Sequence, residues 1–451
     1  MATRLGGVTY CQSGAPMTCC HYYSFADGGD TAFSIDSSSI VFGPGTLSEI
    51  GDHAQALGIT RAALFTDRGV AALPYLASVL ESLRQAKIDC AVYDEVRIEP
   101  TDQSFLAAAR FAGEGQFDGF ISLGGGSVID TTKAANLYST YPGEFLAYVN
   151  APIGEARSVP GALKPHISCP TTSGTGSECT GIAVFDYLAL KAKTGIASRR
   201  LRPTLALIDP DATATLPPSV VAATGFDVLC HALESYTAIP HTMRPRPERA
   251  SLRPMSQGAN PWSDMGCEKA MVLTGKYMER AVSDASDTEA RSSMMWAAAL
   301  AGSAFGNAGV HVPHGMSYSV AGMVKNFRAA GYRQDEPLIP HGMSVILNAP
   351  SAFRFTAPAC PERHFKGAQF LGADVRDAAL DDAGEVVAQE LIRLMRATGI
   401  PNGLSDVGYN NNDIASLTEG AFLQQRLLKN APMEITKERL SDIFAAGMSY
   451  W

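Results

Sequence analysis

The sequence lacks a long hydrophobic run, paired cysteines and an excess of positive charge. No apolar stretch reaches the length of about 18 residues that a transmembrane helix needs. The 9 cysteines are scattered, odd in number and without a CxxC pair, which favours a reducing compartment over a disulfide framework. Lys and Arg number 36 against 45 Asp and Glu, so we expect neither nucleic acid nor an anionic membrane as the main partner.

The N-terminal stretch, residues 1–35, lacks the apolar core of a secretory signal. Asp27 and Asp30, with Asp36 just beyond, count against an organellar transit peptide. We therefore predict an irregular leader over 1–35 and a cytoplasmic protein. A eukaryotic source would make the mitochondrial matrix the alternative.

The first half of the chain alternates short apolar runs with helical patterns, which predicts a parallel sheet covered on both faces. The expected strands are Ala62–Thr66, Cys90–Tyr93, Gly119–Leu123, Ile167–Pro170 and Thr204–Ile208. The expected helices are Ala72–Ala86, Gln103–Gly113 and Ser127–Tyr138. From Pro217 onward the strand signals end, and helical patterns follow at about 219–237, 264–283, 286–308, 376–398 and 435–449. These patterns predict an α/β domain with a Rossmann-like sheet over 36–212 and an all-α domain over 213–451.

Histidine is scarce, with 9 in 451 residues, yet three of them and an aspartate are spaced like a single metal site. Asp227 and His231 lie four residues apart in a predicted helix, so both side chains share one face. His314 and His341 each occur in the string PHGMS, between a proline and a glycine, which predicts a position near a helix start. An Asp/His₃ set without cysteine suits a catalytic divalent transition metal. The alternative is a helical Asp–His pair with two unrelated histidines.

Two loops of the first half have the composition of a phosphate-binding site. Residues 121–130 (ISLGGGSVID) place three glycines between a predicted strand and helix, where backbone N–H groups and the helix start can approach a phosphate. Ile129 replaces the third glycine of the usual dinucleotide fingerprint, and a plain tight turn is the alternative. Residues 170–178 (PTTSGTGSE) add a hydroxyl-rich loop. Asp67 ends the first predicted strand, where it can bind ribose hydroxyls and favour NAD, or cap the next helix.

A proline- and arginine-rich segment over residues 239–263 fits neither helical nor strand periodicity. Long loops in compact domains are often functional. We predict that Arg244 or Arg253 binds a substrate carboxylate, because a guanidinium matches that geometry. The alternative is a solvated surface insertion.

These motifs together resemble the iron-containing (group III) alcohol dehydrogenase family. GGGSVIDTTKAANL, PTTSGTGSE, the D-x₃-H helix and the two PHG strings occur in the family's order, and the likeness runs from about Ser38 to Trp451. EPTD at 99–102, GFDVLCHALESYT and FGNAGVHVPHGMSYS resemble its hydroxyacid-oxoacid transhydrogenase branch. The resemblance implies the dehydroquinate synthase-like fold of this family and a homo-oligomer.

The resemblance also implies site residues. The implied metal ligands are Asp227, His231, His314 and His341, for a divalent metal that would be Fe²⁺ rather than Zn²⁺. The implied NAD-binding residues are Asp67, Gly125, Gly126, Ser127, Asp130, Thr171, Thr172, Thr175, Ser177 and Lys193. Many alcohol-oxidising members carry a histidine where this chain has Tyr318. Tyr318 or His311 is therefore the candidate proton carrier, and either could instead be a packed residue.

The function implied is a metal- and NAD-dependent oxidoreductase acting on small molecules. By resemblance it moves a hydride from 4-hydroxybutyrate to 2-oxoglutarate through bound NAD, giving succinate semialdehyde and 2-hydroxyglutarate. A conventional NAD-dependent alcohol dehydrogenase remains the alternative, because cofactor retention depends on affinity and domain closure. A dehydroquinate synthase-like lyase and a binding protein without catalysis are disfavoured by the four ligand residues.

Overall fold

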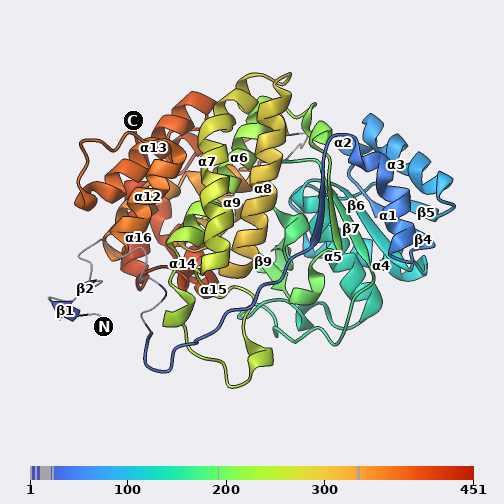
Figure 1. The fold of residues 1–451 in the computed structure, drawn as a ribbon, viewed down its shortest axis with the longest axis horizontal. Helices are drawn as coiled ribbons and strands as arrows, with labels where there is room; N and C mark the ends of the chain where they lie inside the picture. Colours follow the sequence, from blue (N-terminus) through green and yellow to red (C-terminus); the bar gives the residue numbers. More distant parts are fainter. Residues whose placement is uncertain (1–2, 6–7, 11–21, 23–24, 191, 333–335) are drawn as a thin grey trace.

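The computed structural model describes residues 3–5, 8–10, 22, 25–190, 192–332 and 336–451. A half built around a sheet and a helical half lie side by side (Figure 1). The predicted leader falls partly outside the described residues. Its described part includes a short antiparallel pair, β1 (Thr3–Leu5) and β2 (Val8–Tyr10).

The first half contains a six-stranded sheet in the order β3-β10-β7-β6-β4-β5. Every pairing in this sheet is parallel, as the alternation of strands and helices predicts. Its strands are β3 (Ser39–Phe42), β4 (Arg61–Phe65), β5 (Asp89–Tyr93), β6 (Gly119–Gly124), β7 (His166–Pro170) and β10 (Leu205–Ile208). The accompanying helices are α1 (Ile50–Ala56), α2 (Arg68–Ala71), α3 (Pro74–Gln85), α4 (Asp102–Glu114) and α5 (Gly126–Thr140).

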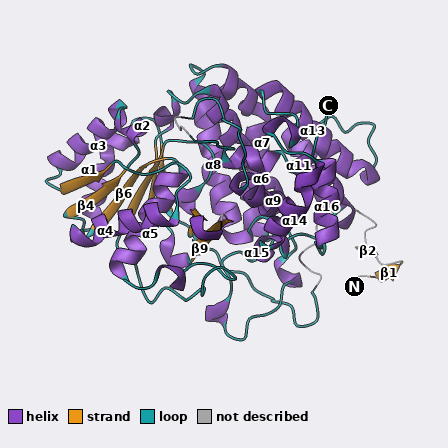
Figure 2. Ribbon diagram, turned by 180° about the vertical axis from the view of Figure 1, so that it is seen from behind, coloured by secondary structure: helices purple, strands orange, loops and turns teal. Residues whose placement is uncertain are grey.

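Both faces of this sheet are buried. Along β4, Leu64 packs in a cluster with residues of α1 and α3, whereas its neighbour Phe65 packs in a cluster with residues of α4 and α5. Successive side chains of a strand point to opposite faces, so the near-continuous apolar run of each strand serves both layers. The result is a sheet with helices on both sides (Figure 2). Because β6 and β7 are parallel neighbours, the loops that follow them lie at the same edge.

A separate antiparallel hairpin, β8 (Ile182–Tyr187) and β9 (Ala192–Ala197), was not expected from the sequence. It packs on α5 and on the helical half. Its strands mix polar and apolar residues, because one side of the hairpin contributes to the cavity described below.

The helical half begins after β10, and all strands of the described residues precede it. Its helices are α6 (Pro218–Thr237), α7 (Pro261–Ser283), α8 (Thr288–Ala308), α9 (Val312–Gly322), α10 (His341–Ile346), α11 (Ala349–Thr356), α12 (Pro361–Leu371), α13 (Ala383–Thr398), α14 (Ile414–Phe422), α15 (Gln425–Leu428) and α16 (Lys437–Ala446). None of the helices in the described part has the length and apolar character needed to span a bilayer.

Helix α6 lies at the centre of this half and packs against α7, α8 and α10. It begins at Pro218, in keeping with the preference for proline in a first turn. No side chain caps the start of α6. The hydroxyl of Ser219, in its first turn, instead donates to the carbonyl of Ala330 at 2.7 Å. Helix α13 begins at Ala383, later than the predicted 376, after a 3₁₀ turn over Leu380–Asp382.

Candidate metal centre and active-site cavity

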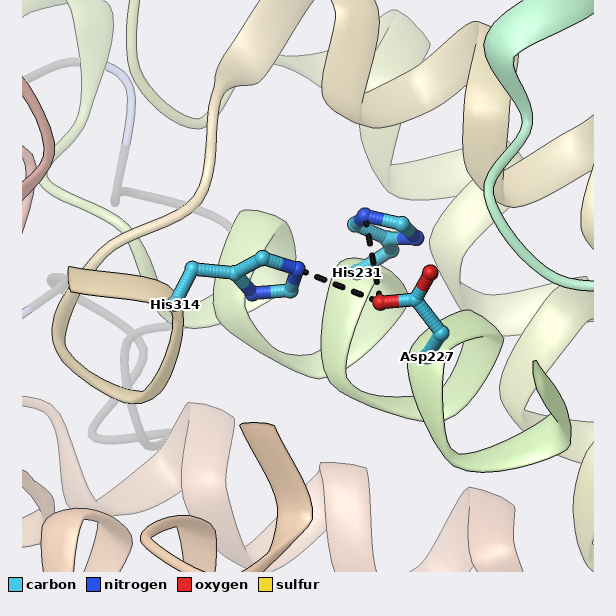
Figure 3. Close-up of side chains that lie close together, drawn as sticks. All are labelled: Asp227, His231 and His314. Atoms are coloured by element: carbon cyan, nitrogen blue, oxygen red, sulfur yellow. Dashed lines mark ion pairs between the residues drawn. The ribbon is translucent and has the colours of Figure 1, made fainter. Parts of the chain in front are cut away.

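Helix α6 supplies two of the four predicted metal ligands. Asp227 and His231 are separated by one helical turn and point to the same side of the helix (Figure 3). Their side chains are almost completely buried, with exposed fractions of 2% and 5%. A carboxylate and an imidazole at this depth need polar partners, since the surrounding core of α6, α7 and α8 is apolar.

His314 and His341 arrive from the starts of two later helices, as the PHGMS strings predict. His314 lies in the first turn of α9, and His341 is the first residue of α10. The Nε2 atoms of His314, His341 and His231 lie 3.4, 3.6 and 3.7 Å from Oδ1 of Asp227. Three imidazoles from three helices thus converge on one carboxylate oxygen. Donor atoms of Asp227, His231 and His314 also lie within 4.8 Å of one another, a group that does not include His341.

This arrangement fits a divalent metal ion. Ligand distances of about 2.1 Å place neighbouring ligands of a tetrahedral site roughly 3.4 Å apart, close to the separations found here. Oδ1 of Asp227, Nε2 of His314 and Nδ1 of His231 are buried and find no hydrogen-bond partner among the described residues. Buried polar atoms without partners are rare and costly, and a metal ion would satisfy the two that face each other.

The ionisation of the imidazoles differs with their surroundings. Burial lowers the pKa of His231 to about 3 and also lowers the pKa of His341, which keeps both neutral, as ligation requires. Burial acts on His314 too, but the carboxylates of Glu234 and Asp227 together outweigh it and raise the pKa of His314 to about 9. The ring of His231 is held by stacking on Phe305, with centroids 3.9 Å apart.

Glu234 is a site residue that the sequence analysis missed. Its Oε1 lies 2.6 Å from Nδ1 of His314, and its Oε2 accepts the backbone N–H of His311 at 2.7 Å. A carboxylate behind a ligating histidine fixes the ring and its tautomer. The signal was present in the sequence, because Asp227, His231 and Glu234 follow an i, i+4, i+7 spacing on one helix face.

A cavity opens in front of these side chains, and both halves of the molecule form its wall. The helical half contributes Asp227, His231, His314, Tyr318, His341 and Arg426. The sheet-containing half contributes Gly126, Ser127, Asp130, Thr175, Ser177 and Lys193. The four predicted metal ligands and six of the ten predicted cofactor residues therefore meet in one space. Gly125, Thr171 and Thr172 do not line it.

The glycine-rich and hydroxyl-rich loops pack directly against each other. A Cβ atom added at Gly126 would lie 2.5 Å from Cγ2 of Thr175, and one at Gly125 would lie 3.2 Å from Cγ2 of Thr172. Glycine is therefore required for the two loops to approach. The first turn of α5 has no side-chain cap. The N–H groups of Val128 and Ile129 donate to the carbonyl of Gly125, which leaves those of Gly126 and Ser127 for a ligand. This combination fits a phosphate of a dinucleotide.

The charged residues on the cofactor side are already paired. Asp130 accepts from the hydroxyl of Ser177 and from the backbone N–H of Val184. Lys193 on β9 lies 2.5 Å from Oε2 of Glu99 and 3.1 Å from Oδ1 of Asp186, its cross-strand partner. Burial would lower the pKa of Lys193, but these two carboxylates raise it, so the ammonium remains charged and neutralised.

The two candidate proton carriers occupy different environments. Tyr318 lies on the cavity wall, with its ring centroid 6.4 Å from that of His341, and burial raises its pKa. His311 does not reach the cavity. It is completely buried, its Nδ1 accepts the N–H of Val312, and its Nε2 lies 3.0 Å from the hydroxyl of Thr237. One ring nitrogen thus binds the start of α9 and the other contacts the end of α6, which corresponds to the packed alternative.

Asp67 occupies the end of β4, as predicted, and caps α2. Its Oδ1 accepts the N–H groups of Gly69 at 2.8 Å and Val70 at 3.0 Å. It lies outside the wall of the cavity. The helix-capping alternative is therefore realised, while one carboxylate oxygen takes no part in the cap.

Contrary to expectation, the structure does not bring Arg244 and Arg253 to the cavity. Arg244 donates to Oδ1 of Asn430 at 2.7 Å, and Arg253 forms a two-pronged ion pair with Asp30, at 2.7 and 3.1 Å. These arginines attach the segment 239–263 to its surroundings. The arginine that does line the cavity is Arg426, from a short helix that carries no recognisable motif.

Comparison with known proteins gives a consistent result. The family model described as iron-containing alcohol dehydrogenase matches residues 37–210, and the model for the C-terminal part of that family matches residues 254–448. The solved structure described as 1,3-propanediol oxidoreductase is 28% identical, with a TM-score of 0.81, covering 92% of this chain and 100% of that one. Sulfoacetaldehyde reductase from Bifidobacterium kashiwanohense, solved in complex with NAD⁺, is 25% identical, with a TM-score of 0.76, over 93% of this chain and 99% of that one.

Curated relatives are more similar in sequence. The protein named mitochondrial hydroxyacid-oxoacid transhydrogenase from Xenopus tropicalis is 50% identical over 93% of this chain and 91% of its own length. The protein of that name from Homo sapiens is 47% identical over 96% of this chain and 94% of its own length. With the family models, the shared fold and these relatives in agreement, the chain belongs to the iron-containing alcohol dehydrogenase family and is an oxidoreductase.

Proposed function

We propose that this protein is a metal- and NAD-dependent hydroxyacid-oxoacid transhydrogenase. It moves a hydride from 4-hydroxybutyrate to 2-oxoglutarate through bound NAD, giving succinate semialdehyde and 2-hydroxyglutarate. The observation that supports this most directly is the shared cavity, in which the Asp/His cluster faces the two loops of the sheet-containing half. The relatives named above supply the substrate class.

The residues divide into two groups, which we assign to the proposed domains 36–212 and 213–451. Asp227, His231, His314 and His341 would hold the metal, for which we propose Fe²⁺ on the strength of the family. The wall formed by α5 and the hydroxyl-rich loop would hold NAD. When bound, the metal supplies a Lewis acid for the substrate hydroxyl and NAD supplies a hydride acceptor.

The chain itself provides orientation, enclosure and proton handling. Glu234 holds the His314 ring through its Nδ1 atom. The cavity lies between the two halves, so closure of one half on the other would exclude water from the reacting groups. Tyr318, which lines this wall with its ring centroid 6.4 Å from that of His341, is the proposed carrier of the substrate proton.

The protein should sustain exchange between the two substrates without added NAD. Purified protein loaded with Fe²⁺ is given 4-hydroxybutyrate and 2-oxoglutarate, and 2-hydroxyglutarate is measured by mass spectrometry over many turnovers. A conventional alcohol dehydrogenase would instead form no product until NAD is supplied, and would then release free NADH. To identify the metal, the protein is stripped with a chelator, and the assay is repeated after Zn²⁺ or Fe²⁺ is added back.

Two further proposals concern the cellular location and the oligomeric state of the protein. The relatives are named mitochondrial, and we propose the mitochondrial matrix for this chain if its source is eukaryotic, and otherwise the cytoplasm. We also propose a homo-oligomer, a dimer or larger, which light scattering on the purified protein would test.

A further inference from the structure

The cavity wall contains one cation that the described residues leave without a partner. Apart from imidazoles, the basic side chains on this wall are Lys193 and Arg426. Lys193 is bound by Glu99 and Asp186. Arg426 forms no hydrogen bond or ion pair with any described residue and is only partly buried. A guanidinium turned toward a cavity with its donors unused is a ready site for an anion.

Contacts made by neighbouring residues hold Arg426 in its position. It lies in α15, which packs against α9, and the adjacent Leu427 and Leu428 are buried. The side chain of Gln424, just before α15, donates to the backbone carbonyl of Lys193 at 3.4 Å. The short helix is thereby anchored both to the metal-side helix α9 and to the hairpin of the cofactor side.

Tyr318 links Arg426 to the metal-side residues. Arg426 and Tyr318 together line the main cavity and a smaller adjoining one. The Tyr318 ring also lies 6.4 Å from that of His341, centroid to centroid. Burial raises the pKa of Tyr318, and among nearby charges Arg426 opposes this most strongly. A short aliphatic chain lying along Tyr318 would therefore have one end at the histidines and the other at Arg426.

We propose that Arg426 binds the carboxylate remote from the reacting carbon in the hydroxyacid and oxoacid substrates and so selects these acids over uncharged alcohols. This inference rests on the proposed function for the identity of the substrates. A carboxylate entering this cavity meets Glu99, Asp130 and Asp227, so without a cation it would be repelled as well as desolvated. Arg426 replaces Arg244 and Arg253 in this role, since their guanidinium groups are bound elsewhere.

The test compares two substrates of equal length in the metal- and NAD-loaded enzyme: 4-hydroxybutyrate and 1,4-butanediol, in which a hydroxymethyl group replaces the carboxylate. In Arg426→Gln, kcat/KM for 4-hydroxybutyrate should fall roughly 10- to 100-fold, mainly through KM, while kcat/KM for the diol changes less than about 3-fold. Arg426→Lys should recover part of the loss, because lysine keeps the positive charge but lacks the planar pair of N–H donors with which arginine binds a carboxylate. Equal losses on both substrates would show a merely structural role and overturn the proposal.

Lys429→Gln is the matched control. Lys429 is exposed, lies three positions after Arg426 and does not line this cavity, so its loss removes the same charge without the proposed contact. We expect it to leave the ratio of the two kcat/KM values unchanged. The proposal would also be overturned if kcat/KM for 4-hydroxybutyrate relative to the diol fell in Arg253→Gln but not in Arg426→Gln.

A binding measurement separates this inference from the proposed function. Calorimetric titration of the loaded enzyme with 2-oxoglutarate should show binding at least about 10-fold weaker in Arg426→Gln than in the unmodified protein. This difference in affinity is expected even if the protein shows no hydride exchange between the two acids. That result would contradict the proposed transhydrogenase activity but not the role of Arg426. Equal affinity of the two proteins, or no binding by either, would overturn the role of Arg426.

Discussion

At the scale of single residues, the candidate metal site depends on a buried carboxylate, that of Glu234, which contacts one of the candidate ligands. Glu234 is completely buried and faces His314, and its carboxylate, together with that of Asp227, raises the pKa of the imidazole. The carboxylate contributes twice, because it fixes the ring and also holds the backbone where α9 begins. Sequence reading finds the ligands through their unusual types, whereas a glutamate in a helix is too common to attract notice.

Replacing Glu234 by glutamine should weaken metal binding by roughly 10- to 100-fold, because the amide can still accept from the backbone but no longer orients His314 as a carboxylate does. Metal competition with a calibrated chelator measures this directly. Glu390→Gln is the control: Glu390 is a buried carboxylate of α13 that binds Arg393, far from the cavity wall. Unchanged metal affinity in Glu234→Gln would contradict the assigned role.

At the scale of elements, the cofactor side is built by the contact between the start of α5 and the hydroxyl-rich loop. The sequence predicts both the β6–α5 turn and the second loop, and both lie where expected. It does not show that Gly126 and Thr175 touch, since the 48 residues between them give no information on their distance. The hairpin of β8 and β9 was missed because it lies outside the main sheet and its polar residues obscure strand periodicity.

Gly126→Ala should weaken NADH binding roughly 10-fold or more, because the added methyl group collides with Thr175 and displaces the start of α5. Fluorescence titration with NADH gives the affinity, and the metal content should stay at the level of the unmodified protein. In Gly113→Ala the new Cβ meets no atom within 4 Å, so that variant should bind NADH normally. Identical NADH affinity in both variants would count against cofactor binding at this loop.

At the scale of the whole molecule, the two halves meet through close backbone contacts as well as through the cavity. Gly176 in the hydroxyl-rich loop and Gly302 in α8 face each other, and a Cβ added at Gly302 would lie 2.7 Å from the Cα of Gly176. The neighbouring Glu178 is buried at this junction, with 3% of its surface exposed. Burial raises the pKa of its carboxyl to about 7, an effect that Lys133 only partly opposes.

This buried acid makes stability depend on pH. Between its ordinary pKa of 4.5 and the folded value of about 7, the folded protein keeps a proton that the unfolded chain has lost. Its contribution to the free energy of unfolding is therefore lost as pH rises through this window, by up to about 3 kcal/mol. Glu178→Gln should be more stable than the unmodified protein at about pH 8 and nearly equal to it at about pH 4.

Urea unfolding at both pH values measures this difference. The control is Glu419→Gln, which removes a solvent-exposed carboxylate of α14 and should show no comparable pH-dependent gain. A stability difference between Glu178→Gln and the unmodified protein that is the same at both pH values would contradict titration of Glu178.

The sequence by itself determined the class of fold, five of the six strands of the parallel sheet and the four candidate ligands; the edge strand β3 was not predicted. These follow from local rules: β4 and β6 are continuous apolar runs, Asp227 and His231 share a helix face, and the PHGMS strings stand at helix starts. Each rule acts over a few residues, so periodicity and residue type are sufficient. The family resemblance drew on the same local motifs.

Only the tertiary structure decided which residues share the cavity. It placed Arg426 on the wall and bound Arg253 to Asp30, it separated Tyr318 from the buried His311, and it put Glu234 behind His314. These outcomes depend on contacts between segments far apart in the chain. Such contacts are set by the packing of whole helices, and neither the period nor the composition of a single segment contains that information.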